Sequence, residues 1–368
     1  MAKVCYNDCT VDNLSLLRYN WTSSQRISKK ILYMNLKGLQ IVLAGQPKFR
    51  FKQAWKAVFV DLISDWNDNT TLPKDLREVL NSECSLDVEA EIFGSEKSES
   101  VKALLTLEDD QKIETVLLRH KDGRNTICLS SQVGCALGCA FCATGKMGFK
   151  RDLTVSEIIL QVLLFARYLK ENKSEKNITN VVFMGMGEPF LNFDNVMESI
   201  KILNDKEAFN IGARHISVST AGIVEEINKF ANEKMQINLA ISLHASNDKL
   251  RAELMPVARK YSLNQLFEAI ENYVEKRSRQ VMFEYLLIDG VNDSEYHAKE
   301  LAGLMKHPLY VVNLIRYNPT GGRFRPSTAT SIRKFKNILL REGIKVTERH
   351  EFGQDIKAAC GQLAGRKK

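Results

Sequence analysis

The chain has 368 residues, of which 44% are hydrophobic and 26% charged, and it carries a net charge of +8 at pH 7. This composition is typical of a globular protein and excludes a chain that is mainly disordered or of low complexity. No uncharged apolar run approaches the roughly 20 residues that a membrane span needs, and the first residues lack the apolar core of a signal peptide. We therefore expect a cytoplasmic protein without membrane contact.

Hydrophobic patterning divides the chain into four parts. Residues 1–33 are polar apart from one possible helix at 23–33, and we expect a flexible leader that the protein can do without. Residues 34–85 predict a small helical accessory domain, and residues 86–124 form a strand-rich connection. The remainder, residues 125–368, alternates between strands and helices.

The accessory domain combines helical patterning with positive charge. Apolar spacing predicts one helix over residues 51–66, and Pro73 suits the first turn of a second helix. Residues 34–60 hold five basic side chains and no acidic one, whereas residues 61–110 hold fourteen acidic and four basic ones. Residues 314–368 are basic again, with thirteen basic and four acidic side chains. Two basic regions suit RNA, although solvated helix faces show the same pattern.

Several side chains are therefore candidates for RNA contact. In the accessory domain aromatic residues alternate with basic ones, so the rings either pack inward or stack on bases. Arginines near the end of the chain are candidate phosphate contacts. The candidates are Lys48, Phe49, Arg50, Phe51, Lys52 and Trp55 in the accessory domain, and Arg323, Arg325 and Arg333 near the C-terminus.

The alternation after residue 125 predicts an α/β fold with a parallel sheet and helices outside it. Six strand–helix units are too few to close an eight-stranded barrel, so we expect an open, partial barrel. Such a barrel places its functional residues at the carboxyl ends of the strands. The predicted strands are 126–130, 178–184, 215–219, 237–243, 281–287 and 310–316, and the predicted helices are 155–169, 193–203, 223–231, 263–275, 295–305 and 331–341.

Three cysteines, Cys135, Cys139 and Cys142, follow the first barrel strand with the spacing CxxxCxxC. Three such thiolates can bind three irons of a [4Fe–4S] cluster and leave the fourth iron open to a small molecule. The alternative is a zinc site with a fourth ligand from elsewhere in the chain. Zinc ribbons usually contain paired CxxC motifs, and this chain has no second pair.

Polar residues follow four further strands, at the edge where a partial barrel places its chemistry. Residues 185–189 follow the second strand, and their glycines allow the backbone to approach a ligand closely. Glu188 in this segment can accept hydrogen bonds from an ammonium group. Residues 219–220, 242–244 and 318–319 end the third, fourth and sixth strands.

The motifs CLSSQVGCALGCAFCATGKMGF, FMGMGEP, SLHA and AACGQLAG together resemble the dual-specificity RNA adenine-C2 methyltransferases, which belong to the radical S-adenosylmethionine (SAM) enzymes. The resemblance runs from about residue 34 to residue 365. It implies a radical-SAM partial barrel, a [4Fe–4S] cluster, two SAM molecules per turnover and an electron donor such as flavodoxin. It also implies a monomer that methylates 23S rRNA in the peptidyl-transferase centre and the adenine 3′ of the tRNA anticodon.

Position by position, the resemblance also implies residue roles. Cys360 receives a methyl group from one SAM, and the radical made from a second SAM turns this methyl into a carbon radical that adds to adenine C2. Cys128 then attacks the Cys360 sulfur and releases the product with a disulfide. Glu114 matches the base that removes the C2 proton. The implied SAM contacts are Gly187, Glu188, Ser219, Ser242, Leu243, His244 and Asn318, with Phe141 near the adenine.

The match has departures. Lys357 stands where the family commonly has an acidic residue, and the stretch from Glu114 to Cys128 is one residue longer than usual. Cys5 and Cys9 lie in the leader, which has no family counterpart, and we interpret them and Cys84 as incidental or structural thiols.

Two other functions fit parts of the pattern. The sister activity at adenine C8 shares most motifs, and LIRYNPT occurs in its members, whereas FCATGKMGFKR and AACGQLAG favour C2. A zinc-dependent RNA-binding protein without catalysis explains the clustered cysteines and the charge. It leaves Cys128, Cys360 and the polar strand ends unexplained.

Overall fold

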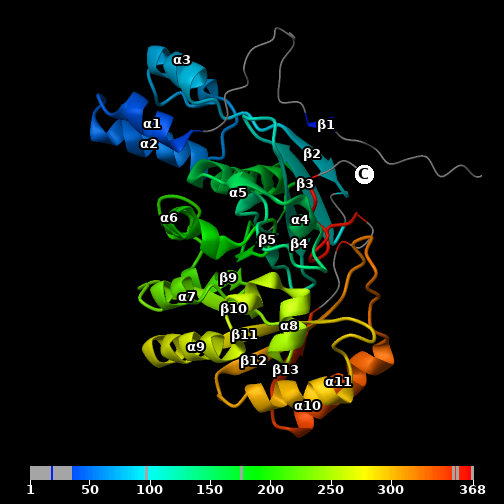
Figure 1. The fold of residues 1–368 in the computed structure, drawn as a ribbon. Helices are drawn as coiled ribbons and strands as arrows, with labels where there is room; N and C mark the ends of the chain where they lie inside the picture. The colour runs from blue at the N-terminus through cyan, green and yellow to red at the C-terminus, as the bar shows by residue number, and fades with distance from the viewer. Residues whose placement is uncertain are drawn as a thin grey trace, which may run out of the picture.

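The structure is a computed structural model that describes residues 18–19, 35–95, 98–174, 177–349, 353 and 356–365. The predicted helix at 23–33 and the leader cysteines lie outside these residues. Within them, one sheet of eleven strands runs through the molecule (Figure 1). Its order is β1 (Arg18–Tyr19), β2 (Ala90–Phe93), β3 (Ser100–Thr106), β4 (Lys112–Arg119), β5 (Asn125–Cys128), β8 (Asn180–Phe183), β9 (Ile216–Thr220), β10 (Asn238–Ser242), β11 (Val281–Leu287), β12 (Tyr310–Arg316) and β13 (Lys345–Glu348).

The sheet has an antiparallel part and a parallel part. β1 to β5 pair antiparallel, whereas β5 and β8 to β13 pair parallel in chain order. The predicted open α/β barrel is thereby confirmed, and it is extended by β13, which sequence analysis did not predict. The strand-rich connection is no separate layer, because β2 to β4 continue the same sheet.

Helices α5, α6, α7 and α9 line one face of the parallel strands (Figure 1). Strand β11 in the middle of the parallel part is almost wholly buried, as expected where both faces of a sheet are covered. Within the described residues, none of the helices combines the length and apolarity that crossing a lipid bilayer requires. The main helices are α1 (Leu36–Leu43), α2 (Lys48–Phe59), α3 (Lys74–Glu83), α4 (Ala143–Met147), α5 (Val155–Glu171), α6 (Phe193–Asn204), α7 (Val224–Phe230), α8 (Asp248–Leu254), α9 (Leu263–Arg277), α10 (Glu295–Leu304) and α11 (Ala329–Arg341).

The predicted helix over residues 51–66 is wrong at both ends, because α2 begins at Lys48 and ends at Phe59. Leu62 has a φ of +55°, in the left-handed region that a helix cannot continue through. Trp66 opens a separate 3₁₀ turn and is fully buried, and its Nε1 donates to the Cys84 carbonyl at 2.7 Å. Its apolar ring therefore belongs to the core without belonging to the helix.

Arg167 of α5 connects the sheet layer to the segment that carries α1 to α3. Its guanidinium donates to the carbonyl of Leu86 at 2.9 Å and to the carbonyl of Ile63. The side chain is buried, and this burial lowers the pKa of Arg167 to about 10. Its two Nη atoms therefore make the hydrogen bonds that offset the burial of the charge, whereas its buried Nε has no partner.

We predict that Arg167→Met lowers the free energy of unfolding by about 2–4 kcal/mol, because it leaves the carbonyls of Leu86 and Ile63 without their hydrogen-bond donor. Chemical denaturation measures this change. The matched control is Lys170→Met on the same helix, which removes an exposed bond to the Asp61 carbonyl at 2.6 Å. That variant should change stability by less than about 0.5 kcal/mol. Equal effects would show that burial at Arg167 contributes nothing.

Candidate active site

A cavity of about 160 Å³ lies at the carboxyl ends of the parallel strands and is closed by residues 356–365. β5, β10 and β12 bring side chains from well separated parts of the sequence to this edge. Seven of the residues singled out in the sequence line it, namely Cys128, Phe141, Cys142, Ser242, His244, Asn318 and Cys360.

The other predicted site residues surround this cavity without lining it. Cys135 and Cys139 belong to the cysteine loop, and Glu114 lies on β4. The predicted SAM contacts in this group follow or belong to the strands β8, β9 and β10. They are Gly187, Glu188, Ser219 and Leu243.

The cysteine loop, residues 135–148, connects the paired antiparallel strands β6 (Gln132–Gly134) and β7 (Phe149–Asp152). Gly134 has a φ of +75°, and a Cβ there would lie 1.8 Å from the Gly148 carbonyl oxygen, so only glycine fits. Cys142 then forms the N-cap of α4. The hairpin therefore returns the chain so that three cysteines fall within one short loop.

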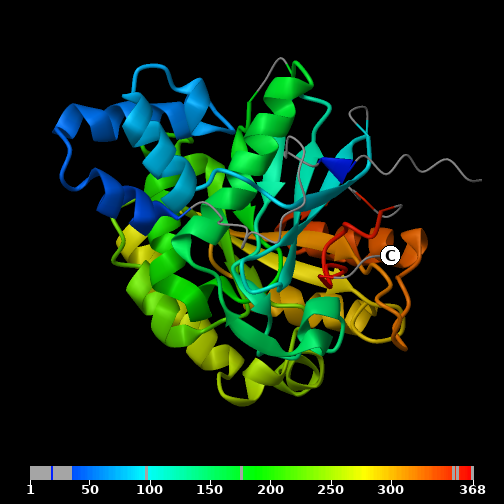
Figure 2. The same ribbon diagram turned by 90° about the horizontal axis from the view of Figure 1, so that it is seen from above.

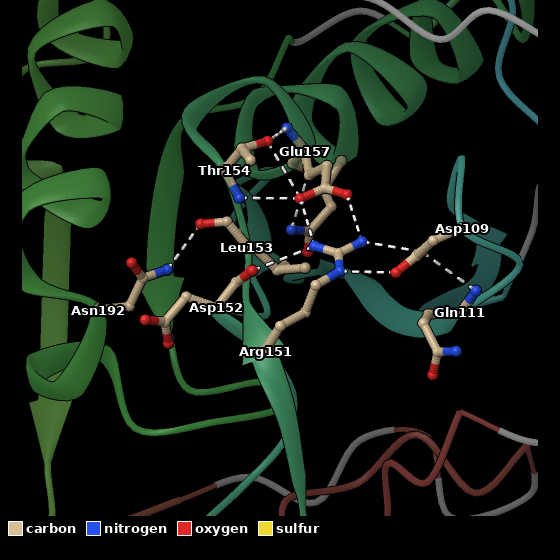
Figure 3. Close-up of polar contacts among 9 residues, drawn as sticks. Asp109, Gln111, Arg151, Asp152, Leu153, Thr154, Glu157 and Asn192 are labelled. Atoms are coloured by element: carbon tan, nitrogen blue, oxygen red, sulfur yellow. Dashed lines mark hydrogen bonds and ion pairs between the residues drawn. The ribbon is translucent and has the colours of Figure 1, made fainter.

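A network around Arg151 of β7 fixes this loop to the sheet (Figure 3). The guanidinium donates to the Asp109 carboxylate at 2.7 and 2.9 Å and to the Glu157 carboxylate at 2.8 and 2.9 Å. Asn192, which is buried, donates to the carbonyls of Ser131 and Leu153 at 2.8 Å each. Both ends of the hairpin are thereby tied to neighbouring elements.

The three thiols lie close enough to affect one another's ionisation. Burial raises the pKa of Cys135 to about 12 and raises that of Cys139, and the neighbouring thiols add to both rises. Metal binding to such thiols releases their protons, so the metal must supply the free energy that deprotonates them. Within the described residues, however, no group of three or more Cys, His, Asp or Glu side chains could hold one metal ion.

Arg251 supports the fit of a cluster at these thiols. It is fully buried on α8, where it donates to the carbonyls of Ala221 and Leu243. Its Nη1 has no hydrogen-bond partner, and its charge works against the rise in the pKa of Cys139. A buried cation with an unused donor near Cys139 suits an anionic iron–sulfur cluster, in which each cysteine would bind a different iron.

Gly187 and Glu188 form a tight turn against Gln132. Gly187 has a φ of +99°, and a Cβ there would lie 2.5 Å from the Gln132 Cβ. The Glu188 carboxylate accepts from the backbone N–H groups of Phe190 at 3.1 Å and Ala221 at 2.7 Å. Burial raises the pKa of Glu188 to about 7, although these hydrogen bonds act to lower it. Ionised Glu188 is therefore available for a cationic ligand from neutral pH upward.

His244 is held as a neutral ring. Its Nδ1 accepts from the Leu286 N–H at 3.1 Å, so the ring proton lies on Nε2. Burial lowers the pKa of His244 to about 3. The ring meets Phe141 edge-on with centroids 4.9 Å apart, and the backbone adopts a φ of +57°. Such an unusual conformation in a non-glycine residue is typical of functional sites.

Cys128, at the end of β5, and Cys360, near the end of the described chain, line the same cavity. Both thiols are free, so the disulfide implied by the resemblance is absent from this structure. Burial raises the pKa of both, that of Cys128 to about 12, while the Arg349 guanidinium works in the opposite direction. Arg349 Nη1 lies 3.6 Å from the Glu284 carboxylate, and both side chains line the cavity.

Sequence analysis missed Arg349 and Glu284. Glu284 stands inside the apolar run VMFEYLL of β11, where a buried strand rarely carries a charge. A charged residue inside this apolar run was the signal by which sequence analysis could have found Glu284. Arg349 follows β13, which was not predicted, so nothing in the sequence linked it to the cavity.

Glu114 holds the segment that carries Cys360. One carboxylate oxygen pairs with the Lys102 Nζ at 2.8 Å, with both side chains at most 5% exposed. The other oxygen accepts from the N–H groups of Ala364 at 2.6 Å and Gly365 at 3.3 Å. Further bonds join the segment to α4, from Ala143 N–H to the Gly361 carbonyl at 2.8 Å and from the Thr144 hydroxyl to the Leu363 carbonyl. Lys357, the departure from the family pattern, is exposed with a φ of +50°.

Comparison with known proteins agrees with this geometry. Residues 129–302 match the family model described as the radical SAM superfamily. A probable dual-specificity RNA methyltransferase RlmN from Staphylococcus saprophyticus is 44% identical over 89% of this chain and 90% of its own length. A protein of the same description from Dictyoglomus thermophilum is 46% identical over 87% of this chain and 91% of its own length. The chain belongs to the RlmN family.

One solved structure resembles this chain over most of the length of both. A radical SAM methyltransferase from Sphaerobacter thermophilus is 42% identical and has a TM-score of 0.86, covering 92% of this chain and 99% of its own. The expected family and fold are thereby confirmed. Membership in the radical SAM superfamily implies a [4Fe–4S] cluster and SAM as cofactors, whereas the roles of individual residues remain predictions.

We predict that replacing Cys135, Cys139 or Cys142 with Ala abolishes cluster assembly in this RlmN-family chain, because each thiolate binds one iron. Iron and sulfide analysis after anaerobic reconstitution measures the loss, together with the brown absorbance. Cys84→Ala is the control, since Cys84 is buried near Trp66 and should leave the iron content unchanged. Full iron content with two of the three thiols would contradict the assignment.

We predict that Glu114→Gln loosens residues 356–365, because an amide cannot serve both Lys102 and the two backbone donors. Hydrogen exchange should show faster exchange at Ala364 and Gly365, by roughly tenfold for each 1.4 kcal/mol of lost stability. Glu99→Gln, which precedes β3, is the comparison for removal of a carboxylate from this part of the chain. Unchanged protection in the Glu114 variant would mean that the remaining contacts, with α4, Asn318 and Pro319, hold the segment without it.

Proposed function

We propose that the chain is a cytoplasmic, monomeric radical-SAM methyltransferase that methylates C2 of an adenine in 23S rRNA and of the adenine 3′ of the tRNA anticodon. The names of the relatives support RNA methylation. The observation that carries the proposal is the placement of two free thiols, Cys128 and Cys360, in one cavity beside Cys142. Radical-SAM catalysis without a protein methyl carrier needs no such pair.

The target carbon explains why a radical route is required. Adenine C2 is electron-poor and has no lone pair, so it cannot attack the methyl group of SAM. Cys135, Cys139 and Cys142 would hold the [4Fe–4S] cluster, which would supply the electron for cleavage of SAM from a donor such as flavodoxin. The chain itself supplies the methyl carrier on Cys360, and two SAM molecules are used because one donates the methyl and the other is cleaved.

Cys128 is suited to release the product. After the carbon radical on Cys360 adds to adenine C2, the adduct loses the C2 proton to Glu114 and one electron, which the cluster would accept. The Cys128 thiolate then attacks the Cys360 sulfur and forms a disulfide. The electron pair of the broken carbon–sulfur bond stays with the carbon, which takes up a proton and becomes the methyl group. Arg349 lies beside both thiols and is the cation that favours the reactive thiolate.

The proposed base, Glu114, is occupied in this structure. Its carboxylate is bound by Lys102 and by the backbone of Ala364 and Gly365. It faces the same side of β4 as Val116 and Leu118, which line the cavity. Release of the segment would therefore free Glu114 on the side where the adenine enters.

The size of the cavity also favours a movable segment. Sites for small ligands usually enclose about 300–1,000 Å³, whereas this cavity holds about 160 Å³ with residues 356–365 in place. SAM and a flipped base need the segment to shift. Cys360 then has one position near SAM and another near Cys128.

Methylation at adenine C8 is the second candidate, and the motif LIRYNPT around Asn318 favours it. The two activities differ in their product alone. Mass spectrometry of nucleosides from RNA incubated with enzyme, SAM and reductant separates 2-methyladenosine from 8-methyladenosine. The second product, or neither, would refute the C2 proposal.

We predict that the two thiol variants fail differently. Cys360→Ala removes the methyl carrier, so neither methylated protein nor protein-bound RNA should form. Cys128→Ala keeps the carrier but cannot release it, so a covalent protein–RNA adduct should accumulate. A denaturing gel with labelled RNA measures the adduct, because only a covalent bond survives. If both variants turn over, or neither forms adduct, the carrier-and-release scheme is wrong.

A further inference from the structure

A second, larger hollow of about 880 Å³ lies beside the cavity, between α11 and the ends of β12 and β13. We call it the α11 groove. Four basic side chains line it against one acidic one. These are Arg316, Arg333, Lys336 and Arg349, with Glu348 as the acid.

The α11 groove is continuous with the cavity. Ile315, Arg316 and Arg349 line both hollows. Arg349 is also the cation that faces Cys128 and Cys360. A chain lying in the groove would therefore contact residues that also line the cavity of the two thiols.

The charges in the groove suit a phosphate backbone. Lys336 is offset by Glu348, whose carboxylate lies 3.0 Å from its Nζ, in an exposed pair of small energetic value. Arg333 is exposed on the same helix, and α11 contains no acidic residue. Basic side chains spaced along a helix bind successive phosphates without reading sequence.

The basic face of α2 is less well placed for this task because none of its residues lines the cavity or the α11 groove, although its ion pairs are of the same kind as the Lys336–Glu348 pair. Lys52 lies 3.5 Å from Glu207, Lys56 lies 3.1 Å from Asp61, and Arg50 donates to Gln53 and to the Thr71 carbonyl. Of its rings, Trp55 packs against the core and only Phe49 is largely exposed. Figures 1 and 2 both show α1 to α3 on the opposite side of the molecule from α11.

We propose that the α11 groove holds the single-stranded RNA backbone next to the target nucleotide, so that the flipped adenine enters the cavity past Arg349. This inference rests on the proposed function and adds the surface that the RNA uses. Flipping a base costs a few kcal/mol, and phosphate contacts on both sides of the nucleotide offset that cost.

The test compares two changes on the same helix in the full chain. Arg333→Gln with Lys336→Gln removes charges that line the groove, whereas Lys334→Gln removes an exposed charge that does not line it. Binding of fluorescein-labelled oligoadenylate is measured over a series of KCl concentrations. The groove variant should bind about tenfold more weakly, with a salt slope smaller by roughly 0.7 for each phosphate that it no longer binds. Lys334→Gln should match the wild type.

Identical affinity and slope in the groove variant and the Lys334→Gln control would overturn the inference. So would a loss of slope confined to a variant with Lys48, Arg50 and Lys52 changed to Gln, which would place the RNA on α2. SAM cleavage without RNA should stay at the wild-type rate in the groove variant, because neither changed residue lines the cavity.

Methylation of an unmodified tRNA transcript separates this inference from the proposed function. A wild-type chain that forms no methyladenosine refutes the proposed function, whatever the binding results. If the wild type methylates the transcript and the groove variant does so with an unchanged KM, the inference alone fails. The expected result is a KM for RNA raised about tenfold with little change in kcat.

Discussion

A buried carboxylate must have its lone pairs engaged, and the site is organised around the way Glu114 meets this demand. Lys102 occupies one oxygen, and the backbone of the C-terminal segment occupies the other. The segment thus lines the cavity and is held both by charge-assisted bonds and by the buried side chains Ile356, Ala358 and Leu363. Moving it would require exchanging the bonds to Glu114 and exposing these three apolar side chains.

Several other polar groups are buried without a full set of hydrogen-bond partners. Arg251 Nη1, Glu284 Oε1 and Ser131 Oγ have no hydrogen-bond partner among the described residues. Each such group costs about 1–3 kcal/mol in a folded protein. They gather near the cysteine loop and the cavity, where bound cofactor and substrate would pair them. These unpaired groups therefore lower the stability of the fold, and they leave donors and acceptors free for charged ligands.

The periodic parts of the sequence predicted the fold well, and the irregular parts did not. Six strand–helix units were visible because buried parallel strands are uniformly apolar and their helices are amphipathic. β13 escaped because its four residues are mostly exposed, so no apolar pattern marks it. The cavity residues on strand ends followed from the barrel rule. Arg349 could not, because its place depends on β13, and the engagement of Glu114 depends on contacts 250 and 251 residues away.

The docked C-terminal segment also limits which sequences can hold Cys360 in place. Gly365 donates its N–H to Glu114 and has a φ of +58°, in the left-handed region that favours glycine. A Cβ at this position would lie 2.7 Å from the Lys112 carbonyl oxygen. Any side chain there would therefore push the segment away from β4. A residue that touches no reacting atom is thus fixed as glycine by the geometry of docking alone.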